Sequence, residues 1–149
     1  MLIGYRQLAA ERESQGIPAL PLNAEQTQEL TLLLEKPTSP EDAEDLLYLL
    51  KERIPPGVDE AAYVKATWLS SIAQETNKSQ LINPLKATRL LGTMIGGYNV
   101  SALIELLEND NKKIANSAAN GLSHTLLVYD AVNDILDLSK TNKFAQKVI

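Results

Sequence analysis

The sequence has 149 residues, a net charge of −5 and no cysteine. Without thiols, this chain cannot form disulfides, perform thiol catalysis, or hold thiolate zinc or a cysteine-ligated iron–sulfur cluster. The length fits one domain, and 25 leucines against 5% aromatic residues predict an aliphatic core built from helices.

The charge pattern and the termini narrow the possible partners. Acidic and basic residues are interspersed, so the chain lacks the positive charge that dominates nucleic-acid binding. The N-terminus has no hydrophobic signal core, and no apolar run approaches the roughly 20 residues of a membrane span. Because a chain without disulfides suits a reducing compartment, we expect a cytoplasmic location and no membrane partner.

The N-terminal quarter of the chain predicts two helices joined by an extended linker. Residues 2–15 read as an amphipathic helix, and the prolines of residues 17–22 favour an extended segment. Asn23 with Gln26 matches a capping box, which predicts a helix from there to about Glu35.

Two further helices are predicted before residue 80. Ser39 and Pro40 form a start signal, with a buried face expected at Leu46, Leu47, Leu49 and Leu50. After Pro55-Pro56-Gly57, Asp59 is a predicted N-cap. The following helix carries apolar residues at helical spacing, namely Tyr63, Ala66, Leu69, Ile72 and Ala73.

The second half repeats the pattern of caps and short apolar helices. Asn83-Pro84 opens a helix that we expect to close at Gly96-Gly97, and Asn99 is expected to cap the next one. Asn111 precedes a helix whose expected buried positions are Ile114, Ala115, Ala118, Ala119 and Leu122.

Residues 126–138 predict another helix, and a last one begins near Asn142. The short run of residues 126–129 could read as a strand, but it lies in helical context. No C-cap glycine or proline follows before Ile149, so we expect the chain to be a fragment of a longer protein.

These elements predict an all-α fold with short connections. The helices that start at Asp59 and Asn99 are offset by 40 residues, close to the roughly 40–47 residue period of HEAT-type repeats. The sequence therefore predicts a HEAT-like superhelix of short antiparallel helix pairs, as one domain over residues 1–149. An irregular helical bundle is the alternative.

Two features could suggest chemistry. The glycines of residues 92–97 lack the lysine and the preceding strand of a phosphate loop, so a tight turn explains them. His124 is the only histidine, and one histidine without cysteine cannot make a usual zinc site. A hydrogen-bonded histidine near a helix end is the simpler interpretation, and we expect neither a catalytic nor a metal site in this chain.

Charged and aromatic residues also have structural explanations. The acidic cluster of residues 41–45 lacks the spacing of a calcium loop, whereas acids near a helix N-terminus complement its dipole. The lysines are interpreted as solvated, namely Lys112, Lys113, Lys140, Lys143 and Lys147. Trp68 and Tyr98 could anchor an interface, although Trp68 lies on an apolar face that favours core packing.

Three segments together resemble the N-terminal region of bacterial-type aconitate hydratase B. They are RIPPGVDEAAYVKA at residues 53–66, LLGTMIGGYN at 90–99 and LSHTLL at 122–127. Their order and spacing also fit, and the likeness covers essentially the whole chain. Residues 35–45 and 110–116 depart more, which affects local loop lengths only.

The resemblance implies a full-length enzyme that interconverts citrate and isocitrate through cis-aconitate, and in some members also dehydrates 2-methylisocitrate. It implies a [4Fe–4S] cluster held by three cysteines in later domains, none of which maps onto this chain. The matching region is HEAT-like, and it is associated with protein–protein contacts, dimerisation and shaping access to the active site. Some members bind messenger RNA, which the net charge of −5 does not support here.

We therefore expect a non-catalytic domain that docks onto its own catalytic domains, onto a second copy or onto another protein. The candidate structural or docking positions are Gly92, Gly96, Gly97, Tyr98, Asn99 and His124. The alternatives are a free-standing helical adaptor and an RNA-binding regulatory module.

Overall fold

The computed structural model describes residues 1–125 and 131–149, and this part of the chain contains helices and no strand. The all-α prediction is confirmed. The first residues of the helix predicted over 126–138 lie outside the described residues. No helix in the described ranges is long and apolar enough to cross a membrane.

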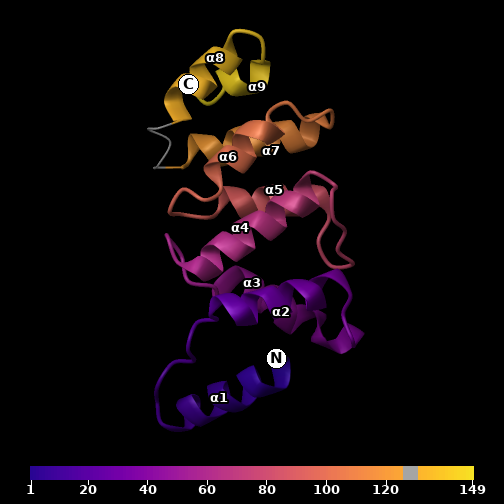
Figure 1. Ribbon diagram of the computed structural model, residues 1–149, viewed down its shortest axis with the longest axis vertical. Helices are drawn as coiled ribbons and strands as arrows, with labels where there is room; N and C mark the ends of the chain where they lie inside the picture. The colour runs from indigo at the N-terminus through magenta and orange to yellow at the C-terminus, as the bar shows by residue number, and fades with distance from the viewer. Residues whose placement is uncertain (126–130) are drawn as a thin grey trace.

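The helices form layers stacked along the long axis of the molecule (Figure 1). In chain order they are α1 (Leu2–Ser14), α2 (Ala24–Glu35), the 3-10 turn η1 (Pro40–Asp42), α3 (Ala43–Glu52), α4 (Glu60–Ala73), α5 (Pro84–Gly92), α6 (Val100–Leu106), α7 (Lys112–Ser123), α8 (Val132–Ser139) and α9 (Lys143–Gln146). Helix α1 forms the N-terminal end alone. Above it lie α2 with α3, α4 with α5, α6 with α7, and α8 with α9.

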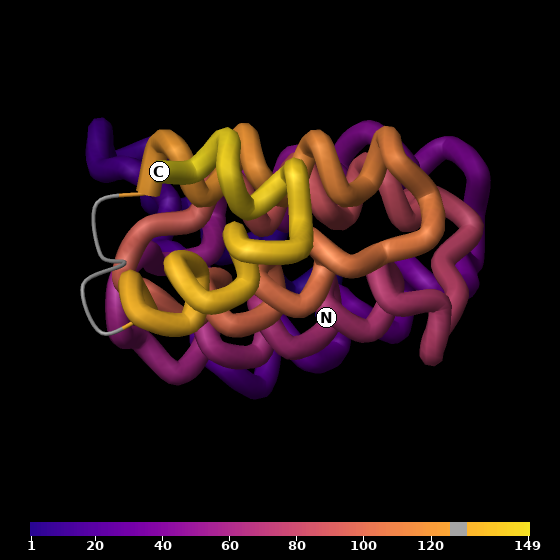
Figure 2. Tube along the Cα trace, turned by 90° about the horizontal axis from the view of Figure 1, so that it is seen from above, coloured from indigo at the N-terminus to yellow at the C-terminus, as the bar shows by residue number. Residues whose placement is uncertain are grey.

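Seen along the stack, the layers lie over one another (Figure 2). Helix pairs stacked in this way match the HEAT-like arrangement predicted from the 40-residue offset, in which each layer contacts its neighbours.

Most predicted caps are present. Asn23 Oδ1 accepts from the Gln26 backbone N–H at 2.8 Å, and Gln26 Oε1 accepts from the Asn23 N–H at 3.0 Å, which completes the capping box. Side-chain oxygens also cap α4, α5, α7 and α9, from Asp59, Asn83, Asn111 and Asn142. Because a cap involves only neighbouring residues, these helix starts could be read from the sequence.

Two local predictions were wrong. Helix α1 is not amphipathic as expected, because only Leu2 is buried, while Ile3 is 73% and Leu8 50% exposed. Tyr63, expected on the buried face of α4, is 58% exposed, and its ring contacts Tyr98 in the loop that follows α5. The start signal at Ser39-Pro40 is confirmed, because the Ser39 hydroxyl accepts from the Glu41 N–H and Pro40 is the first helical residue, although this first turn is the 3-10 turn η1, which continues into α3.

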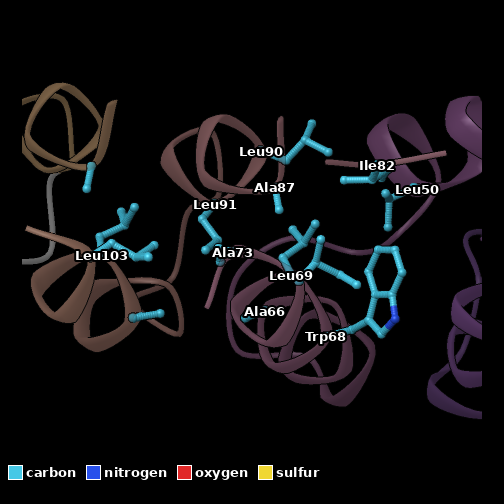
Figure 3. Close-up of a cluster of buried hydrophobic side chains, with 14 of the residues drawn as sticks. Leu50, Ala66, Trp68, Leu69, Ala73, Ile82, Ala87, Leu90, Leu91 and Leu103 are labelled. Atoms are coloured by element: carbon cyan, nitrogen blue, oxygen red, sulfur yellow. The ribbon is translucent and has the colours of Figure 1, made fainter. Parts of the chain in front are cut away.

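The core runs through several layers (Figure 3). Leu50, Leu69, Leu91 and Leu103 come from four successive helices, and each is 0% exposed. Burying one such side chain stabilises the fold by roughly 1.5–3 kcal/mol. These side chains therefore join the successive layers from α3 to α6.

Trp68 lies at the edge of this core, as predicted, and is 7% exposed. Its indole Nε1–H donates to Glu35 Oε1 at 2.8 Å, which satisfies its one polar group and joins α4 to the end of α2.

Candidate functional site

The loop after α5 is the first part of the candidate site. Helix α5 ends at Gly92, four residues before the predicted end at Gly96. Thr93 is its C-cap, and the Thr93 hydroxyl donates to the Leu90 carbonyl at 2.7 Å. Gly96 and Gly97 therefore belong to a connecting loop and do not cap the helix.

Asn99 has a different role from the one predicted. Its side chain makes no cap for α6. Instead it is fully buried, and Nδ2 donates to the carbonyls of Leu91 at 2.6 Å and Met94 at 3.3 Å. The amide thus satisfies one carbonyl in the last turn of α5, that of Leu91, and one in the loop that follows it, that of Met94.

The same loop contacts the turn before α4 through two glycines. Gly96 has φ +103°, a region that side chains rarely adopt, and a Cβ there would lie 2.3 Å from the Gly57 carbonyl oxygen. The Gly57 N–H donates to the Ile95 carbonyl at 3.2 Å. Gly97 has φ +96°, but a Cβ at that position would meet no neighbour within 4 Å. Gly96 therefore joins the two layers, and Gly97 turns the chain.

Around this contact lies an exposed patch, which we call the joint patch: Val58, Tyr63, Ile95 and Tyr98. Their exposed fractions are 75%, 58%, 62% and 37%. The Tyr98 hydroxyl donates to the Val58 carbonyl at 3.2 Å, and its ring meets that of Tyr63 edge-on, with centroids 5.4 Å apart. Two segments 40 residues apart thus present apolar and aromatic side chains on one surface.

A second glycine contact brings α5 against α7. A Cβ on Gly121 would lie 2.8 Å from Gly92 Cα, so α7 cannot carry a side chain at the crossing without a shift, and a Cβ on Gly92 would be tight at 3.1 Å from Gly121 Cα. Gly121 was not among the positions predicted from the sequence. A signal was present, because Ala118, Ala119 and Gly121 give α7 a run of small residues that permits close helix approach.

Beside this crossing is a groove of about 880 Å³ between α5 and α7, bordered also by the C-terminal segment. It contains four groups that are cationic or can become so: Arg89, Lys113, His124 and Lys147. None of the described residues that line it is an aspartate or glutamate. The lysines were predicted to be scattered and solvated, but the fold gathers two of them beside Arg89 and His124.

His124 follows the last residue of α7. Its Nδ1 lies 2.8 Å from the Asn120 carbonyl oxygen, as expected for a hydrogen-bonded histidine at a helix end. Because a carbonyl only accepts, Nδ1 carries a proton, and Nε2 is the acceptor when the ring is neutral.

The candidate positions thus divide into two groups. Gly92 and His124 line the groove, whereas Gly96, Gly97, Tyr98 and Asn99 belong to the loop after α5.

Side chains that could bind a metal do not gather in the described part of the chain. Iron–sulfur clusters are held mainly by cysteine thiolates, and the sequence has none. In the described residues, no group of three histidine or carboxylate side chains could hold an ion. Within the acidic cluster, Asp42 and Asp45 pair with Arg6, which raises the pKa of that guanidinium, chiefly through the hydrogen bond to Asp45.

Comparison with known proteins gives the family that the sequence resembles, over almost the whole length of the chain. A family model described as the aconitate B N-terminal domain matches residues 4–149. Aconitate hydratase B of Synechocystis sp. is 56% identical over 149 residues, which are 100% of this chain and 17% of that protein. The aconitate hydratase B proteins of Pseudomonas aeruginosa and Escherichia coli (strain K12) are each 49% identical, with the same two shares covered.

The chain thus spans 17% of the length of these relatives. The turn before α4 and the loop after α5 belong to the first two segments on which the sequence resemblance rests. These segments are in contact, because Gly57 meets Ile95 and Gly96, and Val58 meets Tyr98. On the family match and these relatives, the chain belongs to the aconitate B N-terminal domain family.

Proposed function

We propose that residues 1–149 form one non-catalytic docking domain at the N-terminus of a longer aconitate hydratase B. In this proposal the full-length enzyme interconverts citrate and isocitrate through cis-aconitate, with its [4Fe–4S] cluster held by cysteines outside this chain. The domain contacts the catalytic domains and thereby shapes access to the active site. The family match and the names of the relatives support the enzyme context.

The joint patch is the observation that carries the docking role. Tyrosines with part of the ring exposed are typical anchors of protein interfaces, and Tyr63 and Tyr98 fit this description. Their edge-on contact and the hydrogen bond from Tyr98 to Val58 hold the rings in place before binding. Ordering them in an interface therefore costs little side-chain entropy.

The residue types support a role without chemistry. The chain has no cysteine for a cluster, and its one histidine donates Nδ1–H to a backbone carbonyl rather than to an orienting carboxylate. The residues of this chain therefore fit contacts and not steps of the reaction.

The test measures binding by isothermal titration calorimetry. The two components are this chain and the remainder of the same enzyme, which is produced without residues 1–149. We expect a complex, and we expect Tyr63→Ser with Ile95→Ser to weaken it about tenfold or more. Leu32→Ser with Tyr48→Ser is a matched control, because Leu32 is 64% and Tyr48 55% exposed on other helices.

Equal affinities for the two variants would remove the joint patch from the interface. No binding by the unmodified chain, with a remainder that holds its cluster, would contradict docking. Self-association of the chain through the same patch, seen in analytical ultracentrifugation, would replace the catalytic domains by a second copy as the partner.

A further inference from the structure

The groove between α5 and α7 has a composition unlike that of the whole chain. The sequence carries 19 acidic against 14 basic residues, yet the described lining of the groove holds Arg89, Lys113 and Lys147 and no carboxylate. The ion pairs in the described part of the chain involve Arg6, Lys140 and the N-terminal ammonium group, and none takes a groove cation. The charge of the groove is thus not neutralised by these pairs.

The polar residues of the groove lie in a row along α7. Lys113, Asn116, Ser117, Asn120 and His124 follow one another at short helical spacings, so they share one helix face. At a rise of roughly 1.5 Å per residue, the row is roughly 16 Å long. An extended peptide advances roughly 3.3 Å per residue, so about five residues would span it.

The amides of this row suit a peptide backbone. Asn116 and Asn120 are exposed and one helical turn apart, and each amide offers a donor beside an acceptor, as a peptide unit does. Asn116 Oδ1 already accepts from Lys147 Nζ at 2.6 Å, which brings that cation over the row.

The glycine crossing keeps the row accessible. Gly92 and Gly121 both line the groove, so no side chain rises from its floor at the crossing. The same contact fixes α5 against α7, which holds Arg89 on one wall and Lys113 on the other.

We infer that this groove binds an extended acidic segment of a separate partner protein, held by the three cations along its carboxylates and by the asparagines at its backbone. The inference goes beyond the proposed function, because it concerns a second surface and a separate partner. RNA fits less well, because no phenylalanine, tyrosine or tryptophan on which bases could stack is among the described residues that line the groove.

The test measures fluorescence anisotropy with a labelled peptide of alternating Glu and Ala, about ten residues long. A peptide of alternating Gln and Ala is the neutral reference. We expect the acidic peptide to bind, with an affinity that falls as salt rises, and the neutral one to bind at least about tenfold more weakly.

Two charge-matched triple variants locate the site. Arg89→Gln, Lys113→Gln and Lys147→Gln should lower the affinity at least about tenfold. Lys36→Gln, Lys51→Gln and Lys112→Gln remove the same charge outside the groove and should change it less than about threefold. Equal losses in both variants would overturn the site. In addition, Asn120→Ala should weaken the peptide about threefold, and an unchanged affinity would overturn the backbone contact.

Tighter binding of another ligand would contradict the proposal. Tighter groove-dependent binding of a single-stranded oligouridylate would assign the groove to RNA, and citrate binding at least as tightly as the peptide would assign it to a small polycarboxylate. The full-length enzyme must bind the peptide too. Loss of binding there, with binding kept by this chain, would mean that the later domains cover the groove, which overturns a separate partner while leaving the proposed docking role intact.

Discussion

Gly96 is the glycine at which the fold can least accommodate an added side chain. It combines φ +103° with backbone atoms of Gly57 at 2.3–2.4 Å from a Cβ position, whereas Gly97 has φ +96° and open space. We expect Gly96→Ala to lower the free energy of unfolding by roughly 3 kcal/mol and Gly97→Ala by roughly 1 kcal/mol. Urea unfolding measures both values. Equal losses would show that the contact with Gly57 contributes nothing.

The sequence marked Gly96 and Gly97 alike as candidate positions, and Gly97→Val is also expected to disturb folding or docking. We still expect this effect, because the positive φ of Gly97 strains any side chain placed there. Gly96 is the stronger test, since its constraint is a contact between layers that no local pattern reveals.

Lys65 is a second residue with a measurable consequence. It is only 8% exposed, and burial lowers its pKa more than the nearby Glu52 carboxylate raises it. The unfolded chain therefore binds this proton more tightly than the folded one, and stability from this group rises with pH between the folded pKa and roughly 10.4.

Lys65→Met removes this cost. We expect the variant to be more stable at pH 7 by roughly 1 kcal/mol, which corresponds to roughly 3 °C in Tm, and the gain to shrink as the pH approaches 10. Thermal unfolding across this pH range tests it, with Lys51→Met on the exposed side of α3 as the control. A gain that grows with pH would reverse the assigned sign.

At the scale of elements, the crossing of α5 and α7 sets how two layers stack. We expect Gly121→Ala to lower stability by roughly 1–2 kcal/mol, because its Cβ meets Gly92 Cα at 2.8 Å. Gly4→Ala is the matched control inside another helix, where nothing lies within 4 Å, and it should raise stability by roughly 0.5–1 kcal/mol. Chemical denaturation measures both, and stabilisation by Gly121→Ala would show that the helices can separate at no cost.

The elements themselves were largely predictable. Four caps start helices as expected, namely Asn23, Asp59, Asn83 and Asn111, because each side chain accepts from the backbone N–H of a residue only two or three positions further on. Asn99 has the same residue type but a different role, since its amide partners, the carbonyls of Leu91 and Met94, precede it in the chain.

At the scale of the molecule, the candidate site depends on how layers align, which sequence spacing does not encode. Arg89 and Lys113 face one groove only because Gly92 and Gly121 let α5 and α7 approach. The resemblance segments at residues 53–66 and 90–99 could be recognised in the sequence. Their contact through Gly57 and Gly96 is a property of the folded stack.

The central claim is that this domain contributes contacts while the chemistry lies elsewhere in the enzyme. The most direct test is to measure citrate–isocitrate turnover in three samples, each supplied with iron and sulfide. The samples are this 149-residue chain, the remainder of the enzyme, and their mixture. We predict turnover in the mixture and none by the chain alone. Turnover by the chain alone would contradict the claim.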